Sequence, residues 1–280
     1  MSTIRTFARS HPLLVTAVGL AIGLAVIWFV PSDGSLANMM FIRLGLTIVM
    51  FAIMAVAAGC NIIVPNAKSI GFSFKKSIYP LVVALVMGVF VLLGTAMKNE
   101  GMVSDWPLQL ALVIMLCLLV GTFEEGLFRG IVFSGLLARF GETRRGLIGA
   151  VIVSSLIFGF VHVTPSIMNG QVVTGLDMAQ AALKTLQAGI LGAFLAALFL
   201  KTRNIWGIAL VHGLNDLFVM LGDALFFRHH VHHVRQQRRD DGQRISRHVR
   251  GVLPAVHPHH RLDGAHAQAS RNPLQRPLCR

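Results

Sequence analysis

The stretch Pro107–Phe123, PLQLALVIMLCLLVGTF, contains no charged residue and runs directly into Glu124-Glu125-Gly126-Leu127-Phe128-Arg129. Placing a carboxylate at the centre of a membrane helix costs roughly 2.5–3.5 kcal/mol on insertion scales. Charged residues in such segments usually face a bundle interior or a water-filled cavity, where they take part in catalysis or transport. The stretch therefore predicts a membrane span with a functional site inside it.

The composition of the chain excludes an ordinary soluble domain. The 280 residues are 54% hydrophobic and only 13% charged, whereas soluble proteins carry about 25% charged residues. Apolar runs of about 20 residues recur along the chain, and this length crosses a bilayer as a helix. The sequence therefore predicts an all-α, polytopic membrane helical bundle of about seven spans. The expected spans are Leu13–Val30, Met39–Ala58, Ile78–Met97, Leu108–Ala138, Leu147–Val163, Met178–Leu200 and Ile205–Phe227.

The fourth expected span, Leu108–Ala138, is too long for one straight crossing. A helix of its ~31 residues would be about 46 Å long, against a hydrocarbon core of about 30 Å. We therefore expect it to tilt strongly or to break, and broken helices at membrane depth are tolerated where they line a cavity. Its glycines offer places to bend: Gly121, Gly126, Gly130 and Gly135.

The distribution of basic residues predicts the orientation in the membrane. Cytoplasmic loops carry an excess of Lys and Arg, and the basic loops of the first six spans all lie on one side if the N-terminus is cytoplasmic. The first apolar run could be a signal peptide, but no small-residue cleavage site closes it, which favours an uncleaved first span. The compact chain fits a protein of the bacterial cytoplasmic membrane.

The last 53 residues differ abruptly in composition from the rest. Residues 228–280 carry 11 Arg, no Lys and only 3 Asp, with 9 of the 12 His, and they show no apolar period. The high net charge therefore reflects this tail, and no nucleic-acid partner is expected. We consider two interpretations: a disordered basic tail, or out-of-frame translation that replaced an eighth span. The domain prediction is 1–106 for N-terminal membrane helices, 107–227 for a catalytic membrane core and 228–280 for the tail.

Charged residues around Glu124 have the spacing of a buried pair and a free carboxylate. Glu125 and Arg129 are four residues apart and can pair on one helix face. Glu124 lies about 100° around the helix and has no local partner. A desolvated lone carboxylate binds protons more tightly and suits a general base. Taken alone, the cluster could equally have a purely structural role and join neighbouring helices.

Two further polar motifs lie in later spans. Phe158 and His162 share one helix face in the fifth span, and His212 and Asp216 share one in the seventh, with Asn215 beside them. Asp216 could fix the His212 tautomer by accepting its N–H. Each motif alone could be a helix-packing cluster. Together the carboxylates and imidazoles favour hydrolysis, in which a carboxylate activates water and the imidazoles polarise a carbonyl group.

Other known types of intramembrane site are missing from the sequence. It contains no C-x-x-C pair, no H-E-x-x-H zinc motif, no rhomboid-type G-x-S-G and no presenilin-type G-x-G-D. Two alternatives to a peptidase remain. The chain could be a non-catalytic membrane peptide-binding or immunity protein, or a proton-coupled transporter that uses Glu124, His162 and His212 as a relay.

The three motifs in this order resemble the CPBP family, the CAAX prenyl proteases and bacteriocin-processing enzymes also called the Abi family. The family pattern is E-E-x-x-x-R, F-x-x-x-H and H-x-x-x-N/D on successive membrane helices. The matching motifs here are Glu124-Glu125-x-x-x-Arg129, Phe158-x-x-x-His162 and His212-x-x-x-Asp216, within about Leu108–Phe227. The resemblance implies an integral membrane endopeptidase that acts on a lipidated or membrane-associated peptide or protein in the bilayer.

The resemblance also implies roles for individual residues. Glu124 would activate water with the help of His162, and His212 and Asp216 would stabilise the oxyanion. Asp216 departs from the usual Asn of this position, and an ionised Asp cannot donate a hydrogen bond. The family is also described as metal-dependent, so Glu124, His162, His212 and Asp216 could instead hold a divalent ion such as zinc. The sequence leaves the glutamate and the metallopeptidase mechanisms open, and no cofactor is required by the first.

Overall fold

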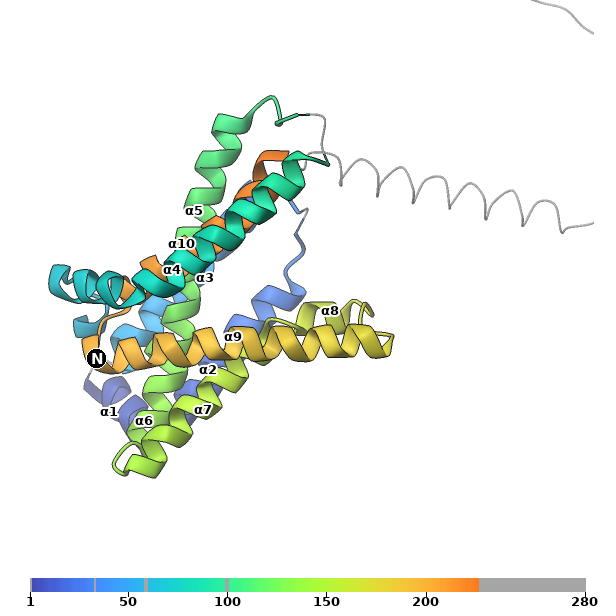
Figure 1. The fold of residues 1–280 in the computed structure, drawn as a ribbon. Coiled ribbons are helices and arrows are strands. Elements are labelled where there is room, and N and C mark those ends of the chain that lie inside the picture. The colour runs from blue at the N-terminus through green and yellow to red at the C-terminus, as the bar shows by residue number, and fades with distance from the viewer. Residues whose placement is uncertain (1, 33, 58–59, 99–100, 227–280) are drawn as a thin grey trace, which may run out of the picture. The chain divides into compact units, whose positions relative to one another are not determined.

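The computed structural model describes residues 2–32, 34–57, 60–98 and 101–226, and within these ranges the chain is helical with no strand (Figure 1). The expectation for the tail from Arg228 lies outside the described residues. The elements are α1 (Ser2–Ser10), α2 (Pro12–Phe29), α3 (Leu36–Ala57), η1 (Cys60–Ile62), α4 (Ala67–Ala96), α5 (Trp106–Glu125), η2 (Gly126–Phe133), α6 (Ser134–Phe140), α7 (Arg144–Val161), α8 (Thr164–Met168), α9 (Gly175–Thr202) and α10 (Ile205–Phe226).

Seven helical segments within the described residues are long and apolar enough to cross a membrane. They coincide with the seven expected spans, which confirms the all-α membrane fold. The third differs most, because α4 starts at Ala67 rather than at Ile78. Asn66 caps it by accepting a hydrogen bond from the Ser69 amide at 3.1 Å. Hydropathy marks only the apolar part of a helix, so it misses an end that carries lysines.

The fourth span does not break. Residues from Trp106 to Phe140 form one continuous helical segment, but its middle part, η2, is wound as a π-helix. The hydroxyl of Ser134 donates to the carbonyl oxygen of Arg129 at 2.8 Å, five residues earlier, and so satisfies a backbone acceptor in this segment. A π-helical segment is rare and is often found at functional sites. This one follows directly after Glu124 and Glu125.

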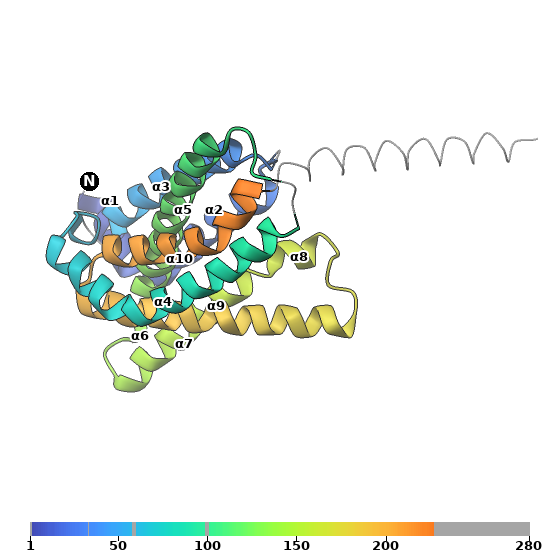
Figure 2. The same ribbon diagram turned by 45° about the horizontal axis from the view of Figure 1, so that its top comes forward.

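Close contacts between small residues set the distance between the helices that carry the candidate site. α10 packs along both α4 and α5, and α7 pairs with α9 (Figures 1 and 2). Where α5 meets α10, a Cβ atom at Gly213 would lie 2.7 Å from the carbonyl oxygen of Cys117. The absence of side chains there lets the two backbones approach, which brings the C-terminal end of α5 beside the first half of α10.

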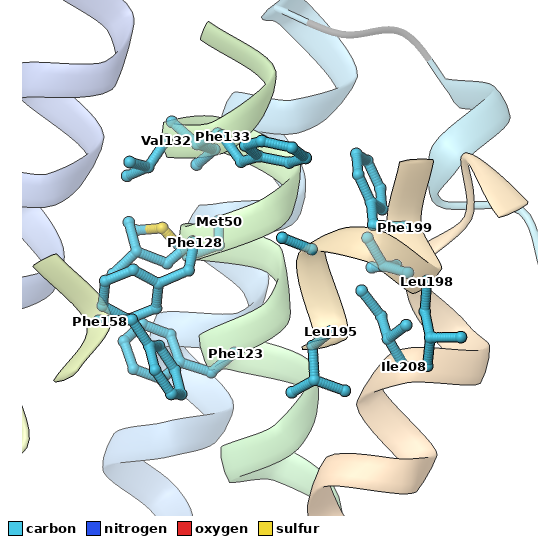
Figure 3. Close-up of a cluster of buried hydrophobic side chains, with 14 of the residues drawn as sticks. Met50, Phe123, Phe128, Val132, Phe133, Phe158, Leu195, Leu198, Phe199 and Ile208 are labelled. Carbon is cyan, nitrogen blue, oxygen red and sulfur yellow. The ribbon is translucent and has the colours of Figure 1, made fainter. Parts of the chain in front are cut away.

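A buried hydrophobic cluster surrounds η2 (Figure 3). Phe123, Phe128 and Phe133 from the fourth span belong to one cluster with buried residues of α3, α7, α9 and α10. Met50 and Met54 of α3 lie against the glycines of η2, Gly126 and Gly130. The π-helical segment is therefore held from several sides, and the charged side chains next to it are fixed by this packing.

Candidate active site

The structure brings the predicted site residues together from four separate elements. Glu124 and Glu125 end α5, and Arg129 lies in η2. His162 is the residue that follows α7, and His212 lies in the first half of α10. α7 crosses obliquely to α5, so that its C-terminal end reaches the site (Figures 1 and 2).

One side of the site is a buried network, which we call the closed side: Glu125, Arg129 and the Nδ1 edge of His212. Glu125 is fully buried, and its Oε1 atom accepts from Arg129 Nη1 at 2.8 Å and from His212 Nδ1 at 2.8 Å. Arg129 also donates from Nη2 to the Gly192 carbonyl oxygen of α9 at 2.9 Å. The network therefore ties α5, η2, α9 and α10 together with charge-assisted hydrogen bonds, the stronger kind in proteins.

Phe158 of α7 packs against Arg129 and against both histidines of the site. The Arg129 guanidinium lies over its ring at 4.4 Å from the centroid. The ring also contacts both imidazoles, with centroid distances of 4.5 Å to His162 and 5.8 Å to His212. Phe158 is completely buried. A cation over an aromatic face is attracted to the ring quadrupole, so Phe158 helps to hold the orientation of Arg129.

The other side, the open side, consists of Glu124, His162, Asp216 and the Nε2 edge of His212. Glu124 Oε2 lies 3.7 Å from His162 Nε2 and 3.9 Å from His212 Nε2. These separations are too long for direct hydrogen bonds. Glu124 Oε2 is buried and has no hydrogen-bond partner among the described residues. The side chains of His162 and Asp216 are 26% and 25% exposed, so this side is partly exposed, unlike the closed side.

Hydrogen bonds at Nδ1 decide which nitrogen of each histidine faces Glu124. His162 Nδ1 lies 2.7 Å from the Phe158 carbonyl oxygen, which can only accept, so Nδ1 carries the proton. His212 Nδ1 likewise donates to the Glu125 carboxylate. In both neutral rings the Nε2 atom then presents a lone pair toward Glu124. If either ring is doubly protonated, its Nε2 becomes a donor at the same place.

Asp216 lies beside the Nε2 edge of His212. Its Oδ2 atom is 3.5 Å from His212 Nε2, and its Oδ1 atom accepts from Asn215 Nδ2 at 3.4 Å. Glu125, rather than Asp216, makes the short hydrogen bond with His212 Nδ1. The reason is the crossing of α5 and α10, which places the last carboxylate of α5 against His212. Asp216 is therefore a neighbour of the Glu124 carboxylate rather than the group that fixes the ring.

The expected metal shell can be tested against the donor atoms. The three contacts between these donor atoms are 3.5–3.9 Å long. They join His162 Nε2 to Glu124 Oε2, and His212 Nε2 to both Glu124 Oε2 and Asp216 Oδ2. Among the residues that the structure describes, no group of three or more His, Cys, Asp or Glu side chains is arranged to hold a metal ion. The mechanism proposed below uses no metal ion, and the metallopeptidase alternative stays a prediction.

Sequence reasoning missed two contacts that position the site. One is the Glu125–His212 hydrogen bond, because pattern spacing within one helix cannot reveal a partner 87 residues away. The other is the anchor next to His162: Trp28 Nε1 of α2 donates to Thr164 Oγ1 at 3.1 Å. Thr164 Oγ1 in turn donates to the Val161 carbonyl oxygen at 2.8 Å. A polar aromatic residue at the end of the first span was the only signal for this contact.

Comparison with known proteins agrees with this architecture. The fold and site define an intramembrane helical protein with a Glu-Glu-Arg motif and two histidines on separate helices. The family model of the type II CAAX prenyl endopeptidase Rce1-like domain matches residues 106–218. The match over these residues confirms the resemblance seen in the motifs, and the matched family is one of membrane proteases. No match was found among curated proteins or among solved structures.

Proposed function

We propose that this chain is a membrane endopeptidase in which Glu124 activates a water molecule for attack on a peptide bond of a membrane-associated substrate. One observation carries the proposal. Glu124 Oε2 is buried without a hydrogen-bond partner among the described residues, yet two imidazole Nε2 atoms from different helices face it at 3.7 and 3.9 Å. A buried carboxylate left in this way favours binding a group that donates a hydrogen bond, and water does so.

The arrangement supports a complete hydrolytic cycle. A water molecule donates one proton to Glu124 and is held through its other hydrogen by His162 Nε2. As Glu124 takes the proton, the water oxygen bonds to the carbonyl carbon and the carbonyl electron pair moves to the oxygen. His212, as an imidazolium paired with Glu125, donates from Nε2 to that oxyanion. Glu124 then passes its proton to the amide nitrogen, the carbon–nitrogen bond breaks, and the two peptide products leave.

The closed side has a supporting role in this cycle. Glu125 holds His212 through Nδ1, so that only Nε2 faces the reacting atoms. Arg129 neutralises Glu125 and ties it to the backbone of α9. Fixed donors of this kind stabilise charge in the transition state without reorganisation. Asp216 lies beside the same Nε2 atom, with its Oδ2 at 3.5 Å.

The test is cleavage of an internally quenched peptide carrying an S-farnesyl cysteine near its C-terminus, by the full chain in lipid nanodiscs. Glu124→Gln removes the base and should lower kcat by about 10²–10⁴-fold. Glu142→Gln, at an exposed glutamate outside the site, is the matched control and should leave kcat unchanged. Wild-type protein that cleaves neither this peptide nor any membrane protein in a proteomic comparison would contradict the proposal. A relay protein would instead lose proton-coupled flux in Glu124→Gln.

The metal-free form of the mechanism has its own measurement. We expect activity to persist after prolonged incubation with a chelator and dialysis, because the proposed cycle uses only Glu124, His162 and His212. Loss of activity that returns on addition of zinc would instead support the alternative in which these residues hold an ion. Metal analysis of the purified protein separates direct loss of a bound ion from inhibition by the chelator.

A further inference from the structure

A cavity of about 310 Å³ lies between α1, α2, α3 and the second half of the fourth span. Small residues leave this space open: Ala8, Ala57, Gly130, Ser134, Gly135 and Ala138. Apolar residues of α2 and η2 complete the wall, and Arg9 is the one charged residue among the described residues that line it. Protein interiors contain few voids larger than a water molecule, and ligand pockets begin at about this size. A largely apolar space of this volume in a membrane bundle therefore calls for an apolar occupant.

The cavity is separate from the candidate active site but shares η2 with it. Ile131 of the cavity wall faces α2, because a Cβ atom at Gly19 would lie 2.9 Å from Ile131 Cγ2. Arg129 extends to the other side of η2, where it donates to the Gly192 carbonyl oxygen of α9. Ser134 lines the cavity, and its hydroxyl donates to the Arg129 carbonyl oxygen at 2.8 Å. The cavity and the site therefore lie on different sides of the same π-helical segment.

The mouth of the cavity lies at the expected level of the lipid headgroups. The short helix α1 precedes the first span, α2, and lies at the same end of the bundle as α6 (Figure 1). On α1, Ile4 and Phe7 are three residues apart and are 63% and 53% exposed, and the helix also carries Arg5 and Arg9. Helices with exposed apolar and basic side chains lie in the interface of a bilayer. Arg9 therefore places a positive charge at the headgroup end of an apolar cavity.

We propose that the cavity binds an acyl chain of an anionic phospholipid whose phosphate is held by Arg9. Arg9 is exposed and forms no ion pair with a described residue, so its guanidinium is free to bind an anion. A planar guanidinium matches a phosphate with two parallel hydrogen bonds, and basic residues next to a span attract anionic lipids. The wall runs from Ala138 to Gly130, about two helical turns along the fourth span, which gives the chain depth to enter. A zwitterionic headgroup carries its own cation beside the phosphate, so it should bind more weakly.

The experiment is photolabelling of the full chain in phosphatidylcholine nanodiscs. One sample contains a small fraction of phosphatidylglycerol with a diazirine on one acyl chain, and a second contains phosphatidylcholine with the same labelled chain. Peptide mass spectrometry then locates the adducts. Phosphatidylglycerol should give about tenfold more adduct than phosphatidylcholine on the peptides that carry Val15, Ile131 and Ala138, because a hydrogen bond between charged groups typically contributes that much.

Two charge variants test the role of Arg9. Arg9→Gln should remove the preference for phosphatidylglycerol at the cavity. Arg5→Gln is the matched control, because Arg5 is also an exposed arginine of α1 but does not line the cavity. It should keep the preference. An equal loss in both variants would show only a general attraction of α1 to an anionic surface, and it would overturn the proposed site.

Two variants of size test the cavity itself. Ala57→Leu places a larger side chain in the wall and should remove the cavity adducts while labelling of the lipid-facing surface persists. Ala17→Leu, at an exposed position of α2 outside the wall, is the matched control and should change nothing. If Ala57→Leu does not fold, Ala138→Leu at the exposed rim of the cavity takes its place. Cavity adducts that persist in the filled variant would overturn the assignment.

The readout is lipid binding, so it does not depend on the proposed peptidase function. Equal labelling of the wild-type cavity by the two lipids would overturn the proposal, since any apolar chain would then suffice. A second measurement needs no photolabel. Phosphatidylglycerol added to the detergent-solubilised protein should raise Tm more than phosphatidylcholine does, because a ligand of the folded state stabilises it. Arg9→Gln should lose this difference and Arg5→Gln should keep it.

Discussion

Glu124 and Glu125 are neighbours in the chain, yet they lie in opposite environments. On the closed side, Glu125 Oε1 accepts two charge-assisted hydrogen bonds and has no exposure to solvent. Each carboxylate keeps one buried Oε2 atom without a hydrogen-bond partner among the described residues, but on the open side Glu124 Oε2 faces the Nε2 atoms of two imidazoles at 3.7 and 3.9 Å. The difference indicates that Glu125 holds the site together, and it supports the proposal that Glu124 activates water.

Removing the closed-side carboxylate should give the largest effect on folding. Glu125→Ala leaves the Arg129 guanidinium buried without its counter-ion and releases His212. Breaking a buried ion pair from one side typically costs about 3–5 kcal/mol. We expect a corresponding fall in the free energy of unfolding of the detergent-solubilised protein, together with loss of cleavage. Glu124→Gln should leave that free energy almost unchanged, and an equal fall in both variants would abolish the distinction between the two sides.

Much of the fold and part of the site could be predicted from the sequence, for different physical reasons. The spans follow from the length of apolar runs. The Glu125–Arg129 pair follows from helical spacing, and in the structure Glu125 Oε1 and Arg129 Nη1 lie 2.8 Å apart. Neither the π-helical winding of η2 nor its contacts with Met50 and Met54 of α3 could be predicted, because contacts between spans leave no pattern in the sequence. The Glu125–His212 contact was missed for a similar reason: it exists only once α5 and α10 cross.

Arg43 is a second residue whose contact with another span could not be predicted from the sequence. In the sequence it is one basic residue near the start of an apolar run, where it could extend toward a membrane surface. Only the position of its guanidinium over Phe123 shows that it is directed into the bundle. Arg129, by contrast, was identified at once because its partner lies four residues away. Local pairs are visible in a sequence, and contacts between spans are not.

On the open side, His162→Gln should reduce activity with little change in stability. The His162 side chain is 26% exposed, and its Nδ1 contact is to its own helix, so few other elements depend on it. We expect kcat to fall by about 10²-fold, the usual size of a positioning or proton-transfer contribution. His212→Gln should lower both activity and the free energy of unfolding, because that side chain is only 2% exposed and holds Glu125. Loss of stability in His162→Gln alone would place it with the closed side.

The smallest effect is expected at Asp216, and it separates the two carboxylates of the open side. Asp216 Oδ2 is closer to His212 Nε2, at 3.5 Å, than Glu124 Oε2 is, at 3.9 Å, so proximity to this nitrogen alone would favour Asp216 as the base. However, the Asp216 side chain is 25% exposed and accepts a hydrogen bond from Asn215, whereas Glu124 Oε2 is buried and faces both imidazoles.

Asp216→Asn replaces an acceptor with an amide that can donate to an oxyanion. We therefore expect kcat within about tenfold of the wild type, or above it, since a change in one exposed polar contact is usually small. A loss as large as that of Glu124→Gln would show that Asp216, and not Glu124, takes the proton from water.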